Sequence, residues 1–284
     1  EVILLVNPFA TYIQTIKNYI YNIKIVEDNL KEQRGYNLNI NSILQEAKGT
    51  YIHILHNKTN VQKGWLSTLL KTIIKNEDIG LIGSKIVLSS EKVKSAGGIV
   101  FNDGSIESYG SNFNLTAPEV NYLKEVDWIS PESMLVKKEV LEEVKESSLS
   151  FLTSTYYAIN LAFEIRKMGY KIVYQPMSTV VSFNIEEEQN SCRIDSKTFV
   201  DRHKQARCNQ TEFGKHQLKA RERSKKTIII IENYCCRFDQ DAGSRTIFQY
   251  IELFIDMGLS VKYLPDDFTP TQPYTSILQQ MGVE

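Results

Sequence analysis

The sequence lacks long apolar runs and lacks an excess of charge of either sign. None of its apolar stretches approaches the roughly 18 residues that a membrane-crossing helix needs. Its formal net charge is -1, and such a balance gives no general attraction to nucleic acid or to an anionic membrane. We therefore expect neither a transmembrane segment nor a nucleic-acid partner.

Cysteine and histidine are also scarce. The four cysteines include no C-x-x-C pair, and the adjacent Cys235 and Cys236 seldom close a ring, so the pattern indicates a reduced, cytosolic protein. The four histidines do not have the short spacings of a zinc site. His53 and His56 are an odd number of strand positions apart and so face opposite sides of a strand. We expect no metal site built from these residues.

The sequence does contain enough apolar residues for a core, and their spacing alternates between that of strands and that of helices. Hydrophobic residues make up 42% and charged residues 24% of the 284 residues. Short buried-strand patterns at 1–6, 22–26, 51–55 and 80–88 alternate with helical spacing at 12–21, 39–49 and 64–76. This alternation predicts a doubly wound α/β fold with a mostly parallel sheet, helices on both of its faces and the strand 51–55 at its centre.

The pattern then changes along the chain. Residues 95–110, with the turn Asn102–Gly104, predict a β-hairpin. A long strand at 125–136, helices at 137–144 and 156–168, and strands at 171–176 and 179–183 complete a first domain, 1–185. Residues 186–226 are predicted to be a helical, charged linker, whose run KARERSKK we interpret as a solvated segment. Residues 227–284 predict the first βαβ unit of a second Rossmann-like domain.

Two groups of motifs resemble known families. The runs EAKGTYIHILHNKT, EVDWISPESMLVKKEVLEEV and FLTSTYYAINLAFEIRKMGYKIVYQP resemble, in this order, the core of family 2 glycosyltransferases, which have the GT-A fold. The resemblance covers 1–185 and implies that a first strand and helix are missing before Glu1, so we expect a fragment open at both ends. The run FDQDAGSRTIFQYIELFIDMGLSVKYLP resembles the start of a family 4, GT-B-type glycosyltransferase. Such tandem fusions occur in bacterial surface-polysaccharide systems.

The resemblance also implies a donor site from which acidic residues are missing. Asn7 stands where the family places an acidic residue against the nucleotide, and Lys58 replaces the metal-binding aspartate. An ammonium group cannot ligate the Mn or Mg that the family uses, so no cofactor is expected in this domain. The nucleotide-sugar-binding residues implied at this site are Asn7, Asn41, His56, Asn57 and Lys58.

The catalytic carboxylates of the family are missing as well. Its pattern YYEDTDLAF aligns without a gap on TYYAINLAF, which places the base positions on Tyr157, Ala158 and Asn160. None of these side chains accepts a proton at neutral pH. The family's late histidine falls on Ser182. Asp127 or Glu132, on a neighbouring strand, is the available substitute base.

The resemblance therefore implies a glycosyltransferase-family protein for glycan or polysaccharide biosynthesis, with a GT-A domain that is catalytically impaired. Two alternatives stay open: an active, metal-independent transferase using Lys58, and a non-catalytic glycan-binding or assembly module. The partners implied are a nucleotide sugar or glycan acceptor and the downstream glycosyltransferase domain of the same chain. We expect a cytoplasmic protein, with a peripheral position at the inner membrane as the alternative.

Two glycine-containing motifs have structural as well as functional interpretations. Gly97 and Gly98 fit the family pattern, and glycine allows a close approach of two backbones. The turn at Asp241, Gly243, Ser244 and Arg245 precedes a helix, so it is either a ligand-binding turn of the second domain or an ordinary helix cap.

Overall fold

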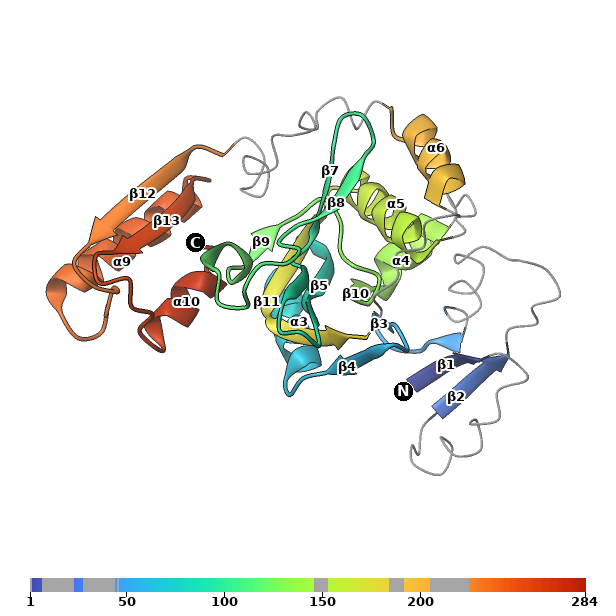
Figure 1. Cartoon of the computed structure of the whole chain (residues 1–284), viewed down its shortest axis with the longest axis horizontal. Helices are drawn as coiled ribbons and strands as arrows, with labels where there is room; N and C mark the ends of the chain where they lie inside the picture. Colours follow the sequence, from blue (N-terminus) through green and yellow to red (C-terminus); the bar gives the residue numbers. More distant parts are fainter. Residues whose placement is uncertain are drawn as a thin grey trace.

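The computed structural model describes residues 2–6, 23–27, 44, 46–145, 153–183, 192–204 and 225–284. These residues form a large α/β unit and a smaller C-terminal unit beside it (Figure 1). Within them, no helix is both long enough and apolar enough to cross a membrane. The expected helix at 12–21, Asn7, Asn41 and most of the linker lie outside the described residues.

A seven-stranded sheet organises the large unit. Its main path runs in the order β3, β10, β5, β11, β4, with β6 paired to β5 and β9 paired to β11. The strands are β3 (Tyr51–Leu55), β4 (Thr59–Val61), β5 (Ile79–Leu88), β6 (Val93–Ser95), β9 (Lys124–Glu125), β10 (Ser133–Lys137) and β11 (Lys171–Ser182). The predicted strand at 125–136 is thus interrupted between β9 and β10.

The α/β class is confirmed, but the strand directions are mixed rather than mostly parallel. In this sheet only β5 and β11 pair in parallel, whereas β10 is antiparallel to both β3 and β5. The reason lies in the connection between β5 and β10, which contains strands and one 3-10 turn, η1 (Pro118–Val120), but no α-helix. Parallel neighbours need a crossover, usually a helix, and a chain that returns without one can pair antiparallel.

The prediction that β3 is central is wrong for the described residues. β3 stands at the end of the strand order, with β10 as its partner. The strands expected on its other side, β1 (Val2–Val6) and β2 (Ile23–Glu27), instead pair in parallel with each other as a separate two-stranded sheet. They are therefore not part of the sheet that contains β3.

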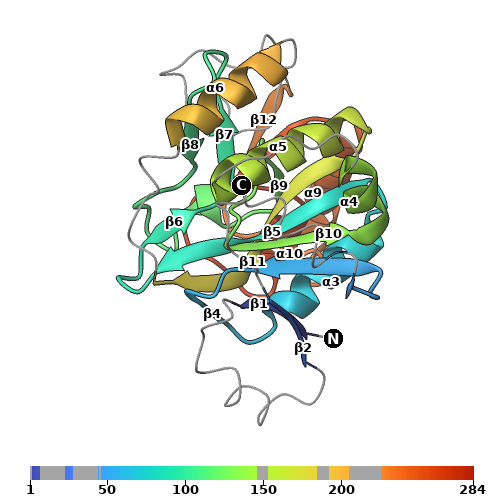
Figure 2. The same ribbon diagram turned by 90° about the vertical axis from the view of Figure 1, so that its right-hand side faces the viewer.

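Helices cover both faces of the sheet, as predicted (Figure 2). They are α3 (Trp65–Lys75), α4 (Lys138–Lys145) and α5 (Ser154–Lys167). Successive strand residues face opposite sides, so Met134 packs into the core cluster that contains α4 and α5, whereas Leu135 packs with Leu69 and Ile73 of α3. Burying each such side chain contributes about 1.5–3 kcal/mol.

The predicted hairpin is present. β7 (Gly98–Val100) and β8 (Ile106–Ser108) pair antiparallel. Gly98 has no room for a side chain, because a Cβ placed there would lie 1.9 Å from Trp128. Gly97 has a φ of +87° and packs against Val126. Close packing thus accounts for both glycines.

The two strands predicted at 171–176 and 179–183 form one strand, β11. Its register with β5 shifts between Gln175 and Thr179, which is a bulge. Pro176 lies inside this bulge, where a residue without an N–H group costs no ladder hydrogen bond. The bulge therefore lets one long strand contain an interior proline.

Helix α6 (Cys192–Arg202) covers part of α5. Phe199 lies edge-on to Phe163, with ring centroids 5.2 Å apart. The guanidinium of Arg202 donates to Glu164 at 3.0 Å. Burial alone would raise the pKa of Glu164, but hydrogen bonds and charge from Lys167 and Arg202 lower it.

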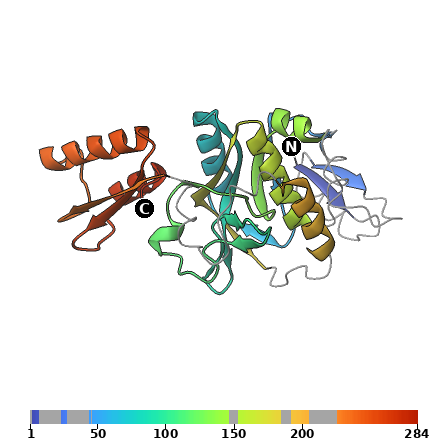
Figure 3. The same ribbon diagram turned by 90° about the horizontal axis from the view of Figure 1, so that it is seen from above.

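The C-terminal unit has the βαβ order that the sequence predicts. β12 (Thr227–Glu232) and β13 (Ser260–Pro265) are parallel and joined by α9 (Ala242–Asp256), and α10 (Tyr274–Gln280) follows. Seen from above, this unit lies beside the large sheet (Figure 3). Ile228 and Ile230 pack into its core, whereas Ile229 and Ile231 on the other face of β12 are exposed.

The two units touch through α10. The side-chain amides of Gln175 and Gln280 pair reciprocally, at 2.9 and 3.1 Å. The backbone N–H of Leu123 donates to the Gln279 carbonyl at 2.8 Å. Gln175 is fully buried, so this contact is a built interface between the units.

Candidate functional site

The carboxyl edge of the large sheet brings together several positions that the sequence singled out. At this edge β4 pairs with the end of β11, where Thr59 is opposite Ser182. The N–H of Phe183 donates to the Lys58 carbonyl at 3.0 Å, and the N–H of His56 donates to the Glu132 carbonyl at 3.1 Å. Open α/β sheets bind ligands at such an edge, so we take it as the candidate site.

Glu132 is the acidic side chain at the centre of this edge. Its Oε1 accepts hydrogen bonds from Ser182 Oγ at 2.6 Å and from Lys94 Nζ at 2.9 Å. Lys94 Nζ also lies 3.3 Å from Ser182 Oγ. The Glu132 side chain is 8% exposed and that of Lys94 is 29% exposed, so the lysine forms the solvent side of the cluster.

The second carboxylate oxygen of Glu132 is unusual. Oε2 is buried and accepts no hydrogen bond within the described part of the chain. A buried acceptor without a donor typically costs about 1–3 kcal/mol, and such groups are rare in folded proteins. This oxygen is therefore a feature that requires an explanation.

Lys94 is the residue at this edge that the sequence reasoning missed. It lies on the short strand β6, which pairs antiparallel with the end of β5. In the structure Lys94 stands between the buried residues Val93 and Ser95. Only the strand pairing, however, brings Lys94 next to Glu132 and Ser182.

The turn after β3 carries the three residues that the resemblance assigned to donor binding. The hydroxyl of Thr59 donates to the His56 carbonyl at 2.6 Å, and the Lys58 N–H donates to His56 Nδ1 at 3.3 Å. The side chains of Asn57 and Lys58 are exposed. The turn is thus held by local hydrogen bonds and presents Lys58 to solvent.

These residues do not suit a divalent cation. Manganese and magnesium need several oxygen ligands. Here Lys58 contributes an ammonium group, and the carboxylate of Glu132 is paired with Lys94. In the described ranges, no three His, Cys, Asp or Glu side chains are grouped so as to hold a metal. A metal-free site remains a prediction, which nucleotide binding can test.

The positions aligned with the family base lie inside α5. Tyr157 is 7%, Ala158 0% and Asn160 3% exposed. Asn160 Oδ1 lies 2.9 Å from His203 Nε2, at the end of α6. All three side chains are therefore buried in the packing around α5, and Asn160 faces His203 rather than the sheet edge.

Asp127, the other proposed substitute base, is engaged in the fold. Its carboxylate accepts the Val100 N–H at 2.9 Å and is buried. Arg166 donates to the neighbouring carbonyls of Val126 and Asp127 at 2.7 and 3.2 Å. Asp127 thus secures the hairpin, and of the two proposed carboxylates only Glu132 joins Ser182 at the candidate site.

A polar network runs beneath the site. His53 Nε2 lies 3.1 Å from Ser133 Oγ, and the hydroxyls of Ser84, Ser133 and Ser178 follow at 2.7 and 2.8 Å. The His53 ring lies edge-on to Trp65, with centroids 4.6 Å apart. Burial lowers the pKa of His53 to about 3. The ring is therefore neutral at physiological pH, and it takes part in the network through its hydrogen bond with Ser133.

This shift predicts a loss of stability in mild acid. The unfolded chain takes up a proton on His53 below about pH 6.5, whereas the folded chain does so only near pH 3, so stability falls as the pH drops between these values. At pH 4.5 the penalty should approach about 2.5 kcal/mol. Urea unfolding at pH 7 and 4.5 measures it. His53→Gln should lose clearly less stability over this interval; an equal loss in both proteins would contradict the assignment.

The turn before α9 is a helix cap in this structure. Asp241 accepts the Ser244 N–H and the Ser244 hydroxyl, both at 2.7 Å, and these bonds lower the pKa of Asp241. A hollow of about 340 Å³ lies there, lined in part by Asp241, Gly243, Ser244 and Glu232. Arg245 is exposed and is not part of that lining. A ligand role for this turn remains a prediction.

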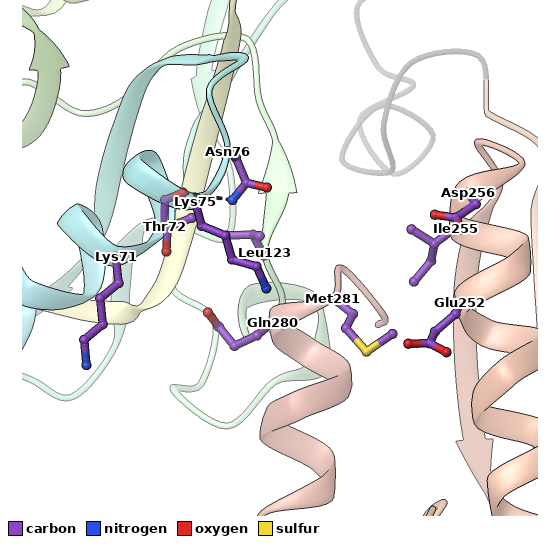
Figure 4. A pocket seen from close by; sticks show the side chains of 10 residues that line it. All are labelled: Lys71, Thr72, Lys75, Asn76, Leu123, Glu252, Ile255, Asp256, Gln280 and Met281. Atoms are coloured by element: carbon purple, nitrogen blue, oxygen red, sulfur yellow. Dashed lines mark hydrogen bonds between the residues drawn. The ribbon is translucent and has the colours of Figure 1, made fainter.

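A larger cleft, of about 820 Å³, lies between the units. Figure 4 shows Lys71 and Lys75 of α3 on one wall and Glu252 and Asp256 of α9 on the other. Within the described residues no ion pair joins these walls. The cleft is lined by neither the turn after β3 nor the Glu132 cluster, so it is separate from the candidate site.

No family model and no curated protein matches the chain. Among solved structures, the crystal structure of GalNAc-T7 with UDP, GalNAc and Mn2+ is similar to this chain, with a TM-score of 0.55 and 15% sequence identity. The match covers 71% of this chain and 41% of that one. The mannosyltransferase PcManGT from Pyrobaculum calidifontis, in complex with GDP-Man and Mn2+, aligns at 16% identity over 72% of this chain and 53% of its own, with a TM-score of 0.45.

The first of these similarities establishes architecture, since 15% identity is too low to carry more. The match spans less than half of the GalNAc-T7 chain. The second similarity has too low a TM-score to support an argument. The large unit therefore has a GT-A-like α/β fold: a central mixed sheet with helices on both faces.

Proposed function

We propose that the chain is a glycosyltransferase-family protein that binds a nucleotide sugar at the carboxyl edge of its large sheet and whose GT-A-like domain is catalytically impaired. The GT-A-like fold and the sequence resemblance support the ligand class. GalNAc-T7, which has a similar fold, was crystallised with UDP and GalNAc. The role in glycan or polysaccharide biosynthesis rests on the resemblance.

The main support for impaired catalysis is the position of the residues aligned with the family base. The three positions aligned with the family base are buried in α5, and Asn160 is bonded to His203 of the adjoining helix segment. General base catalysis contributes roughly 10²–10⁴-fold to such reactions. A domain that lacks this base at its aligned positions would transfer sugar slowly or not at all, while its fold still binds the donor.

An active, metal-independent transferase is the second candidate, and the Glu132 cluster favours it. Glu132 is a carboxylate at the correct edge of the sheet, where Ser182 and Lys94 donate hydrogen bonds to it. In this candidate Glu132 accepts the proton of the acceptor hydroxyl, and the exposed Lys58 supplies the positive charge that stabilises a leaving diphosphate.

For the C-terminal unit we propose the beginning of a GT-B-type domain. Its parallel βαβ order supports this proposal. The Glu284 N–H donates to the Val261 carbonyl at 3.2 Å, and the Tyr263 N–H donates to the Glu284 carbonyl at 2.9 Å. Glu284 thus lies beside β13 with the hydrogen-bond pattern of a neighbouring parallel strand.

Nucleotide binding with and without metal tests the proposed function. Calorimetry with UDP, GDP and their sugars should give dissociation constants that agree within about twofold in manganese and in EDTA, because the edge offers too few oxygen ligands. Incubation with the same nucleotide sugars should release no nucleotide above the buffer rate. Micromolar binding that requires manganese and is abolished by Asn57→Ala would contradict the site. Turnover that disappears in Glu132→Gln would favour the second candidate.

A further inference from the structure

We infer that Glu132 and Lys94 form the subsite that binds the sugar hydroxyls of the ligand. This inference rests on the proposed function, because the ligand class comes from it. The aligned family pattern assigns no role to Lys94, and the sequence nominates Glu132 only as a proton acceptor. The cluster has a fixed geometry, no net charge and one carboxylate oxygen without a donor in the described ranges.

The two carboxylate oxygens of Glu132 differ in their hydrogen bonding. Glu132 Oε1 has two donors, Lys94 and Ser182, whereas Oε2 has none in the described ranges. A buried carboxylate oxygen is a strong acceptor, and the cost of leaving it unpaired is removed when a ligand supplies the donor. A hydroxyl group supplies one proton in a short, directional bond. The cluster therefore selects a donor, not a second anion.

The charges of Glu132 and Lys94 cancel. Glu132 and Lys94 form an ion pair at 2.9 Å, so the cluster is neutral as a whole. A diphosphate placed against it would meet the carboxylate as well as the ammonium. A sugar carries hydroxyl groups that both donate and accept, so one can donate to the carboxylate while its neighbour accepts from the ammonium. A neutral sugar thus matches both members of the pair.

The Glu132 cluster is fixed at the carboxyl edge of the large sheet. Ser182 fixes Glu132 from β11, and the Glu132 backbone carbonyl holds His56 at the start of the turn after β3. The cluster is therefore attached to the two segments that form the edge of the sheet. Its members Lys94 and Ser182 lie on the strands β6 and β11, and Glu132 directly precedes β10, so rigid elements fix the cluster as precise recognition requires.

The test compares nucleotide sugars with their own nucleotides. UDP, UDP-glucose, UDP-N-acetylglucosamine, GDP and GDP-mannose are titrated into the full chain in EDTA. In the wild type, at least one nucleotide sugar should bind about tenfold more tightly than its nucleoside diphosphate. Glu132→Gln and Lys94→Met should remove this advantage and leave the diphosphate affinity within twofold. The matched controls Glu142→Gln, on the exposed side of α4, and Lys63→Met, on an exposed loop, should retain it.

The outcomes separate this inference from the proposed function. If diphosphates bind but no sugar adds affinity, or if the variants keep the advantage, the subsite is overturned and the nucleotide site stands. If no nucleotide binds at all, the proposed function fails, and a stability measurement decides about the cluster. Replacing an ion pair that has a buried member and is not needed for folding by apolar residues is often stabilising. The double variant Glu132→Met with Lys94→Met should therefore melt about 2–4 °C higher; a lower melting temperature would show a structural pair and overturn the inference.

Discussion

Ala158→Asp is expected to unfold the large unit rather than to restore catalysis. Ala158 is fully buried in α5, so the new carboxylate would enter the core between α5 and its neighbours. An uncompensated buried charge costs about 3–5 kcal/mol, a large fraction of the stability of a typical domain. Chemical denaturation followed by circular dichroism should show an early or non-cooperative transition.

Asn160→Asp is the matched variant that separates folding from chemistry. It changes one atom, and the new carboxylate keeps His203 as a partner at the position now 2.9 Å away. We expect it to fold and to release no nucleotide from a nucleotide sugar, because that side chain faces α6. A normally stable Ala158→Asp, or turnover by Asn160→Asp, would show that this part of α5 still faces a usable active site.

Gly98→Ala should be the second severe substitution. The added methyl group would lie 1.9 Å from the Trp128 ring, so either the tryptophan or the β7–β8 hairpin must move. Overpacking of this kind typically costs about 1–3 kcal/mol and sometimes more. Thermal melting would measure the loss, and the quenching of Trp128 fluorescence would report the displacement.

Gly243→Ala is the control for this effect. Gly243 lies in the first turn of α9, and a Cβ there would meet only Asp241 Oδ1 at 3.4 Å. Alanine is also the better helix former by about 1 kcal/mol. This variant should be as stable as the wild type or slightly more so. Equal melting temperatures for Gly98→Ala and the wild type would mean that the packing around Trp128 adapts at no cost.

The periodic parts of the sequence were sufficient to predict most elements of the fold. The helical spacing at 64–76 predicted α3, whose buried residues Leu69 and Ile73 are one turn apart, and the run 80–88 predicted β5. Strand partners could not be derived in this way, because the edge or central position of β3 depends on where distant segments fold. Here β1 and β2 pair with each other, and β3 pairs only with β10 among the described strands.

The candidate site was predictable to the extent that it follows strand ends. His56 and Lys58 follow β3 directly, and their place at the carboxyl edge was visible in the alternation of the sequence. The sequence could propose Glu132 as a substitute base but could not distinguish it from Asp127, because both lie in the same predicted strand before β10. Their hydrogen bonds separate them: Asp127 holds Val100, and Glu132 holds Lys94. Lys94 had no motif to reveal it.

The amide pair between the units has a consequence for how the protein responds to its solvent. Gln175, Gln280 and the Leu123 backbone carry no formal charge and do not titrate. Ionic strength screens attraction between charges but has little effect on buried amide hydrogen bonds. These hydrogen bonds at the junction are therefore insensitive to salt and to pH, whereas the attraction between the charged walls of the neighbouring cleft weakens as the ionic strength rises.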